Sequence, residues 1–272
     1  MKKRINILSL LPVGLILLIL IGIIIRTTAL FFAFDTDIGY FNQSSPLTYA
    51  NNALVLVALS FVCVLSLLLK KNELPLSLPS HDIWSSASSM TLGFVFGVSA
   101  VLLYIVKITV YASLLSHIII LLAAISAIYY IYEGIVALKV GASALIKVIF
   151  SILSSICLFM IVLSENFDFY TTLNNPEKVL TMFVFVISPI FFIQASRFEA
   201  DAPQPKLFIL SSFATAFLGA YTAIPAIIAN CAGILSDSKY LIYYLLALAL
   251  SVYAFVRFLV YIKSSVKHPT EE

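Results

Sequence analysis

The stretches Leu15–Ile25, which reads LILLILIGIII, and Leu54–Leu69, which reads LVLVALSFVCVLSLLL, decide the fold class. Both are apolar on every face. The strands of a membrane β-barrel alternate apolar and polar residues, so these runs do not fit barrel strands. An apolar run of about 20 residues is long enough to cross the hydrocarbon core as a helix. The sequence therefore predicts an all-α integral membrane protein.

The composition of the whole chain agrees with these runs. Of its 272 residues, 62% are hydrophobic and 11% are charged, whereas an ordinary soluble domain is roughly 45–50% apolar and about 25% charged. This composition excludes a soluble globular protein and a disordered chain. Three cysteines and a net charge of +3 exclude a disulfide scaffold and a nucleic-acid binder. We expect residues 1–272 to form one polytopic membrane domain with no soluble domain.

Eight apolar runs have the length of a membrane span. They cover residues 6–25, 52–69, 88–106, 112–132, 142–163, 179–196, 207–229 and 240–262. The third and fourth runs are nearly continuous, but a single helix of that length would be about twice as long as the hydrocarbon core is thick. A turn is therefore predicted at Lys107–Tyr111.

The distribution of Lys and Arg predicts the orientation, because cytoplasmic loops carry an excess of these residues. An even number of spans with an inner N-terminus puts twelve of the 16 cations inside. The inner set is Lys2, Lys3, Arg4, Lys70, Lys71, Lys139, Lys147, Arg197, Lys206, Arg257, Lys263 and Lys267, and the outer set is Arg26, Lys107, Lys178 and Lys239. We expect a bacterial plasma-membrane protein with both termini in the cytoplasm.

Two stripes of small residues align between the halves of the chain. They are Ser89, Gly93 and Gly97 in the third span, and Ser212, Ala216 and Ala220 in the seventh. Such stripes let membrane helices approach closely. The pairs Phe34-Asp35 and Phe167-Asp168 also follow corresponding spans. Two interpretations stay open: a parallel repeat of residues 1–140 and 141–272, or chance similarity between apolar sequences.

Charges and prolines inside the spans give the next candidates. Lys147 and Arg257 lie near the inner ends of their spans, where long cationic side chains reach the interface. Pro189 and Pro225 are expected to kink their helices. Tyr221 and Asn230 flank Pro225 and could line a cavity or satisfy the carbonyls that a proline frees.

The longest outer loop holds a further candidate site. Asp35 and Asp37 are followed by Gly39, which permits a tight turn. Three interpretations stay open: a weak cation site, an ion pair with Arg26, or a solvated turn. The later ligands of a calcium-binding EF-hand are missing.

A short motif in this region resembles one in a group of uncharacterised multi-pass membrane proteins from low-GC Gram-positive bacteria. The matching residues are Arg26, Phe34, Asp35, Gly39 and Tyr40. The group has no assigned activity, so the resemblance implies a bacterial membrane protein and nothing more specific.

Three functions remain in view. The first is binding or transport of a small or lipidic molecule between two helix halves, with Arg26, Asp35, Asp37, Asp168, Tyr221 and Asn230 as candidate binding residues. The second is a non-catalytic subunit that docks a membrane-protein partner, or a second copy, through small-residue stripes facing lipid. The third is a membrane-embedded transferase or hydrolase using outer acids, among them Glu165. No nucleotide-binding, hydrolase or metal motif is present, so no enzyme activity, cofactor or metal is expected.

Overall fold

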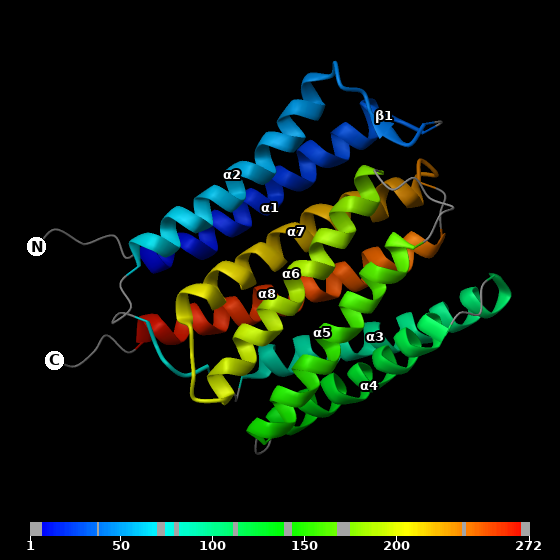
Figure 1. The fold of residues 1–272 in the computed structure, drawn as a ribbon. Coiled ribbons are helices and arrows are strands. Elements are labelled where there is room, and N and C mark those ends of the chain that lie inside the picture. Colours follow the sequence, from blue (N-terminus) through cyan, green and yellow to red (C-terminus); the bar gives the residue numbers. More distant parts are fainter. Residues whose placement is uncertain are drawn as a thin grey trace, which may run out of the picture.

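The computed structural model describes residues 7–36, 38–69, 74–78, 82–110, 114–138, 143–167, 175–235 and 238–267 (Figure 1). In these residues the helices are α1 (Ile7–Phe32), α2 (Pro46–Leu68), α3 (Ile83–Val110), α4 (Leu114–Ala137), α5 (Ala144–Asn166), α6 (Pro176–Glu199), α7 (Pro205–Cys231) and α8 (Ser238–Lys267). Strands β1 (Phe34–Asp35) and β2 (Tyr40–Phe41) form a short antiparallel hairpin. All eight described helices are long and apolar enough to span a membrane. The predicted all-α, multi-pass architecture is confirmed.

Both the start of α1 and the end of α8 lie at one end of the bundle, and the β1–β2 hairpin lies at the opposite end (Figure 1). We call these the terminal end and the hairpin end. The helices run alternately between them, so α6 and α8 begin at the hairpin end. The start of α1 and the end of α8 therefore lie at the same end of the bundle, which agrees with an even number of spans.

The centre of the bundle is α7, of whose span 83% is buried, compared with 22% for α2. The α1–α2 pair packs mainly against α7, whereas the α3–α4 pair packs against α8 and α5 (Figure 1). The first four helices therefore lie in two separate pairs around α6–α8. The four-plus-four repeat stays a prediction.

Several helices start at a capping residue followed by proline, a combination that fits the first turn of a helix. Ser45 accepts a hydrogen bond from the Leu47 amide at 3.3 Å before α2, and Asn175 accepts one from the Glu177 amide at 2.9 Å before α6. These caps make both helices start earlier than residues 52 and 179. The α1 helix continues past Arg26 to Phe32: Thr28 donates its hydroxyl to the Ile24 carbonyl at 2.8 Å, and residues 29–32 are apolar.

The predicted turn at Lys107–Tyr111 is wrong in its position. The α3 helix continues through Val110, and residues 111–113 lie outside the described residues. The segment holds no Gly or Pro that would end the helix earlier.

Each small-residue stripe packs within its own pair of neighbouring helices. A side-chain carbon added to Gly93 would lie 2.7 Å from the backbone nitrogen of Ile131 in α4, so only glycine fits there. Ser89 donates a hydrogen bond to Glu133 at 3.2 Å, also across α3 and α4, and Gly97 faces Ala127.

The second stripe behaves in the same way. Ser251 in α8 donates a hydrogen bond to the Ala216 carbonyl of α7 at 2.6 Å, and Ser212 and Ala220 are buried. The expectation that these stripes face lipid is therefore wrong. Their small residues lie in the contacts between neighbouring helices, where they let the two backbones approach closely.

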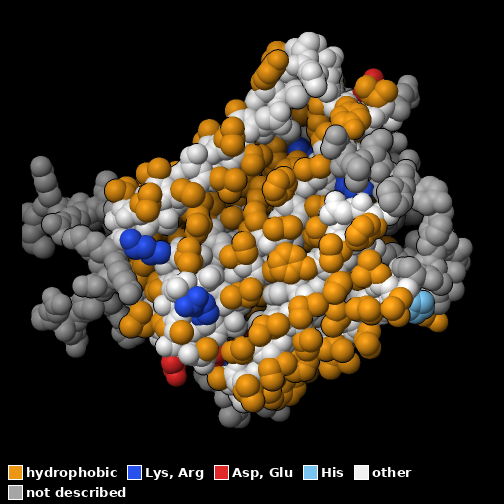
Figure 2. All heavy atoms as spheres, in the orientation of Figure 1, with side chains coloured by type: hydrophobic (Ala, Val, Ile, Leu, Met, Phe, Trp, Pro, Cys, Tyr) orange, Lys and Arg blue, Asp and Glu red, His pale blue; other side chains and the backbone are white. Residues whose placement is uncertain are grey.

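Lipid-facing surface comes instead from large apolar side chains, which dominate the face drawn in Figure 2. Leu56, Val57 and Leu67 of α2 are more than half exposed in the isolated chain. Exposed apolar area on this scale is stable only in a hydrocarbon environment.

Candidate functional site

A buried ion pair crosses the bundle near the hairpin end. The Arg26 guanidinium of α1 donates to Glu177 Oε1 in the first turn of α6. Arg26 has no exposed surface and Glu177 is 3% exposed. The cation also lies 5.0 Å from the Tyr221 ring centroid and 5.9 Å from that of Phe41. Arg26 is thus held by a carboxylate and two aromatic faces.

A second polar contact joins the same elements. The Tyr221 hydroxyl of α7 lies 2.5 Å from Asn51 Oδ1 and 2.9 Å from the Asn51 carbonyl of α2. Because Tyr221 also contacts Arg26, four helices meet in one connected polar cluster formed by Arg26, Asn51, Glu177 and Tyr221. This hairpin-end cluster ties the α1–α2 pair to α6 and α7.

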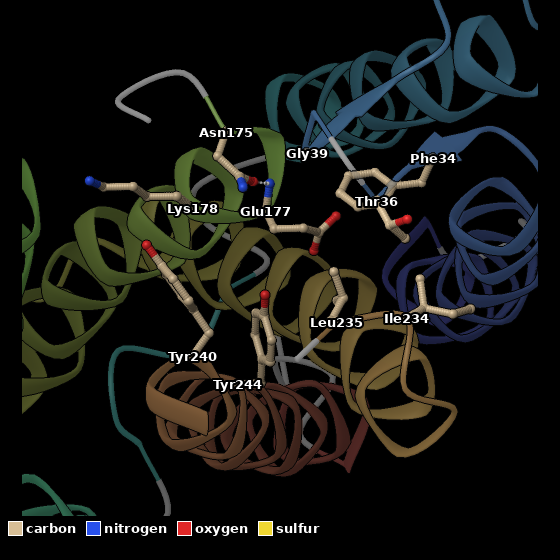
Figure 3. Close-up of a pocket in the computed structure, with 10 residues that line it drawn as sticks. All are labelled: Phe34, Thr36, Gly39, Asn175, Glu177, Lys178, Ile234, Leu235, Tyr240 and Tyr244. Atoms are coloured by element: carbon tan, nitrogen blue, oxygen red, sulfur yellow. Dashed lines mark hydrogen bonds between the residues drawn. The ribbon is translucent and has the colours of Figure 1, made fainter. Parts of the chain in front are cut away.

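A pocket of about 180 Å³ opens at the hairpin end, and Glu177 forms part of its lining. The lining comes from the β1–β2 hairpin, the start of α6, the α7–α8 connection and the start of α8. Its residues are Phe34, Thr36, Gly39, Asn175, Glu177, Lys178, Ile234, Leu235, Tyr240 and Tyr244 (Figure 3). The carboxylate of Glu177 is directed between Thr36 and Leu235, whereas Lys178 extends away from that group (Figure 3). The pocket therefore lies between segments from the two halves of the sequence.

Arg257 and Lys147 at the terminal end are paired with carboxylates of neighbouring helices, which contradicts the prediction that they reach the membrane interface. Arg257 lies 3.5 Å from Glu133 Oε1 and donates to the Ser85 hydroxyl at 2.6 Å. Lys147 donates to Glu199 Oε1 at 2.7 Å. A carboxylate on a neighbouring helix, the buried Glu133 for Arg257 and the partly exposed Glu199 for Lys147, offers each cation a partner, so neither side chain needs to extend into the interface.

The structure places the predicted binding residues in different surroundings. Arg26 and Tyr221 belong to the hairpin-end cluster beside the pocket. Asp35 accepts a hydrogen bond from the Ile38 amide at 3.3 Å and so stabilises the hairpin turn. The partner that the structure gives Arg26 is Glu177, and the ion pair with the loop acids remains one of three open interpretations. Asn230 donates to the Leu235 carbonyl at 2.7 Å beyond the end of α7.

Three further predicted positions are not placed in the site by the structure. Of these, Asp37 and Asp168 lie outside the described residues. Glu165 accepts a hydrogen bond from Tyr243 at 3.0 Å and is not among the residues that line the pocket. The convergence of outer acids that a hydrolase or transferase would need therefore stays a prediction.

The two prolines lie within continuous helices. Pro189 is buried in α6 and Pro225 is buried in α7. Pro225 cannot donate to the Tyr221 carbonyl, because proline has no amide hydrogen. Each proline thus removes one main-chain hydrogen bond from its helix, and in α7 the carbonyl concerned is that of Tyr221, a residue of the hairpin-end cluster.

Glu177 and Asn51 were not among the predicted site residues. Both precede the spans predicted from hydropathy, so they were assigned to loops. The signal that would have placed Glu177 in a helix is Asn175-Pro176, a cap followed by a proline at the first helical position. No comparable signal shows that Glu177 faces Arg26.

Comparisons with known proteins add no family. No family model matches the chain, and no curated protein or solved structure shows significant similarity to it. Within the described residues, no group of three or more His, Cys, Asp or Glu side chains is arranged to hold a metal ion.

Proposed function

We propose that the protein binds a small or lipidic molecule in the hairpin-end pocket and transports it across the membrane. The pocket supports this proposal because it holds a buried, ionisable side chain at one end of the membrane-spanning bundle. Ionisable residues within membrane spans are costly, and they usually mark a substrate or ion pathway.

The position of the pocket fits the same function. Its lining joins the β1–β2 hairpin to α6 and α8, and the hairpin-end cluster lies beside it. Movement of the α1–α2 pair away from α7 would break both contacts of this cluster and widen the pocket. Binding sites between segments that can move relative to each other are typical of transporters.

The cellular setting belongs to the proposal as well. The excess of cations at the terminal end favours cytoplasmic termini, and the resemblance of the Arg26–Tyr40 motif supports a bacterial plasma membrane. In that orientation the pocket opens at the outer face of the membrane.

The alternative role as an accessory subunit lacks the docking surface predicted for it. Gly93 and Ala216 are buried within their helix pairs. An accessory subunit would need another contact surface, and no described residue favours one.

A binding experiment tests the proposed function. Leu235→Trp should fill the pocket, and Leu207→Trp places the same side chain on an exposed site at the far end of α7. Native mass spectrometry of the purified protein in micelles, with defined phospholipids added one at a time, measures what each variant retains. We expect Leu235→Trp to lose a bound species that wild type and Leu207→Trp keep. Equal retention by all three proteins would refute binding in this pocket.

A further inference from the structure

The hairpin-end pocket contains a hydrogen-bond acceptor that lacks a donor. Glu177 Oε1 accepts from Arg26, but Glu177 Oε2 is buried and has no hydrogen-bond partner among the described residues. A buried carboxylate oxygen without a donor is costly, so a ligand group that donates a hydrogen bond there would be favoured.

The rest of the lining indicates the charge of that group. Phe34, Tyr240 and Tyr244 contribute aromatic rings, and the Tyr244 hydroxyl is directed toward the side of the pocket that holds Glu177 (Figure 3). Lys178 carries the opposite charge but extends away from Glu177. Aromatic rings beside a carboxylate are the surroundings in which proteins hold ammonium groups. Arg26 shows the same chemistry in this chain, between Glu177 and the rings of Phe41 and Tyr221.

The size of the pocket limits the ligand. Pockets for drug-sized ligands are roughly 300–1,000 Å³, and this pocket is about 180 Å³. It is large enough for a headgroup or a small amine and too small for a whole lipid, whose chains would remain in the bilayer. Resting on the proposed function, we infer that the pocket binds a primary ammonium group. A primary ammonium can donate to Glu177 Oε2, whereas a quaternary ammonium has no hydrogen to donate.

The inference predicts a preference between two lipids that differ at the nitrogen. Wild-type protein in nanodiscs or micelles is titrated with phosphatidylethanolamine and with phosphatidylcholine of the same acyl chains, and binding is measured by native mass spectrometry. One charge-assisted hydrogen bond should favour phosphatidylethanolamine by about tenfold or more. Ethanolammonium and choline chlorides, added as competitors, show whether a free amine is also bound.

A double variant assigns the preference to Glu177. Arg26→Met/Glu177→Met removes both charges together and so leaves no unpaired charge in the interior. Lys147→Met/Glu199→Met removes the ion pair at the terminal end and serves as the matched control. The preference should disappear in the first variant and persist in the second.

The outcomes separate this inference from the proposed function. Displacement of bound lipid by ethanolammonium but not by choline supports a primary-ammonium site open to free amines. Lipid preference without such displacement supports a lipid headgroup as the source. Equal binding of both lipids, abolished by Leu235→Trp, overturns the ammonium inference and leaves the proposed function standing. Absence of any binding sensitive to Leu235→Trp overturns both.

Discussion

The buried ion pair between Arg26 and Glu177 gives the sharpest prediction about stability. Replacing Glu177 with Met leaves a guanidinium with no exposed surface and without its carboxylate partner. An uncompensated buried charge of this kind costs about 3–5 kcal/mol. Replacing Arg26 with Met leaves the buried Glu177 carboxylate uncompensated, which also costs about 3–5 kcal/mol, and removes the contact with Tyr221.

The double variant should therefore be more stable than Glu177→Met alone, although it carries one more substitution. With both charges removed, the remaining cost is that of the aromatic contact, about 2 kcal/mol or less. The free energy of unfolding is measured in bicelles by titration with SDS, followed by far-UV circular dichroism. A loss in the double variant equal to the sum of the two single losses would refute the reasoning, because the two residues would then act independently.

The pair Lys147 and Glu199 provides the control cycle. The side chains of Lys147 and Glu199 are 10% and 20% exposed, so water can solvate either charge when its partner is removed. We expect single losses of about 1 kcal/mol or less for these residues. Losses as large as those at Glu177 would show that burial is not the cause of the difference.

Three further predictions concern packing, hydrogen bonding and orientation. Gly93→Ala should destabilise the protein by about 1–3 kcal/mol, because the added carbon collides with the α4 backbone; Gly97→Ala, with its nearest contact at 3.6 Å, should be close to neutral in the same SDS titration. Tyr221→Phe should cost about 1 kcal/mol, since it leaves the Asn51 side-chain acceptor without its donor; a change below the error of the titration would contradict this contact. Cys231 is exposed at the hairpin end and Cys157 is buried, so a membrane-impermeant maleimide added to intact cells should label Cys231 and leave Cys157 unmodified, whereas protection of Cys231 until lysis would reverse the proposed orientation.

Some details of the helices could be predicted and others could not. Hydropathy located every described helix, but it placed the start of α6 too late, so that Glu177 fell in a loop. The capping residue Asn175 followed by Pro176 carries that information, because it marks a helix start that apolar content does not detect. The sequence after Lys107 holds no Gly or Pro that would stop a helix, and α3 accordingly continues through Val110.

The sequence does not predict which charged residues pair with each other. Arg257 was expected to extend to the interface, yet it is paired with Glu133 and donates to Ser85. Length and position along a span show how far a side chain could reach. They do not show which neighbouring helix holds a partner for it.

The sequence by itself determined the class of this protein and the approximate position of its spans, because crossing a bilayer is a requirement that each segment meets alone with its own apolar residues. The tertiary structure alone decided which polar residues meet. Arg26 and Glu177 are 151 positions apart, and Asn51 and Tyr221 are 170 apart. In a membrane the outward faces of helices are as apolar as the inward ones, so no amphipathic pattern records which face meets which neighbour. The candidate site depends on those contacts between helices.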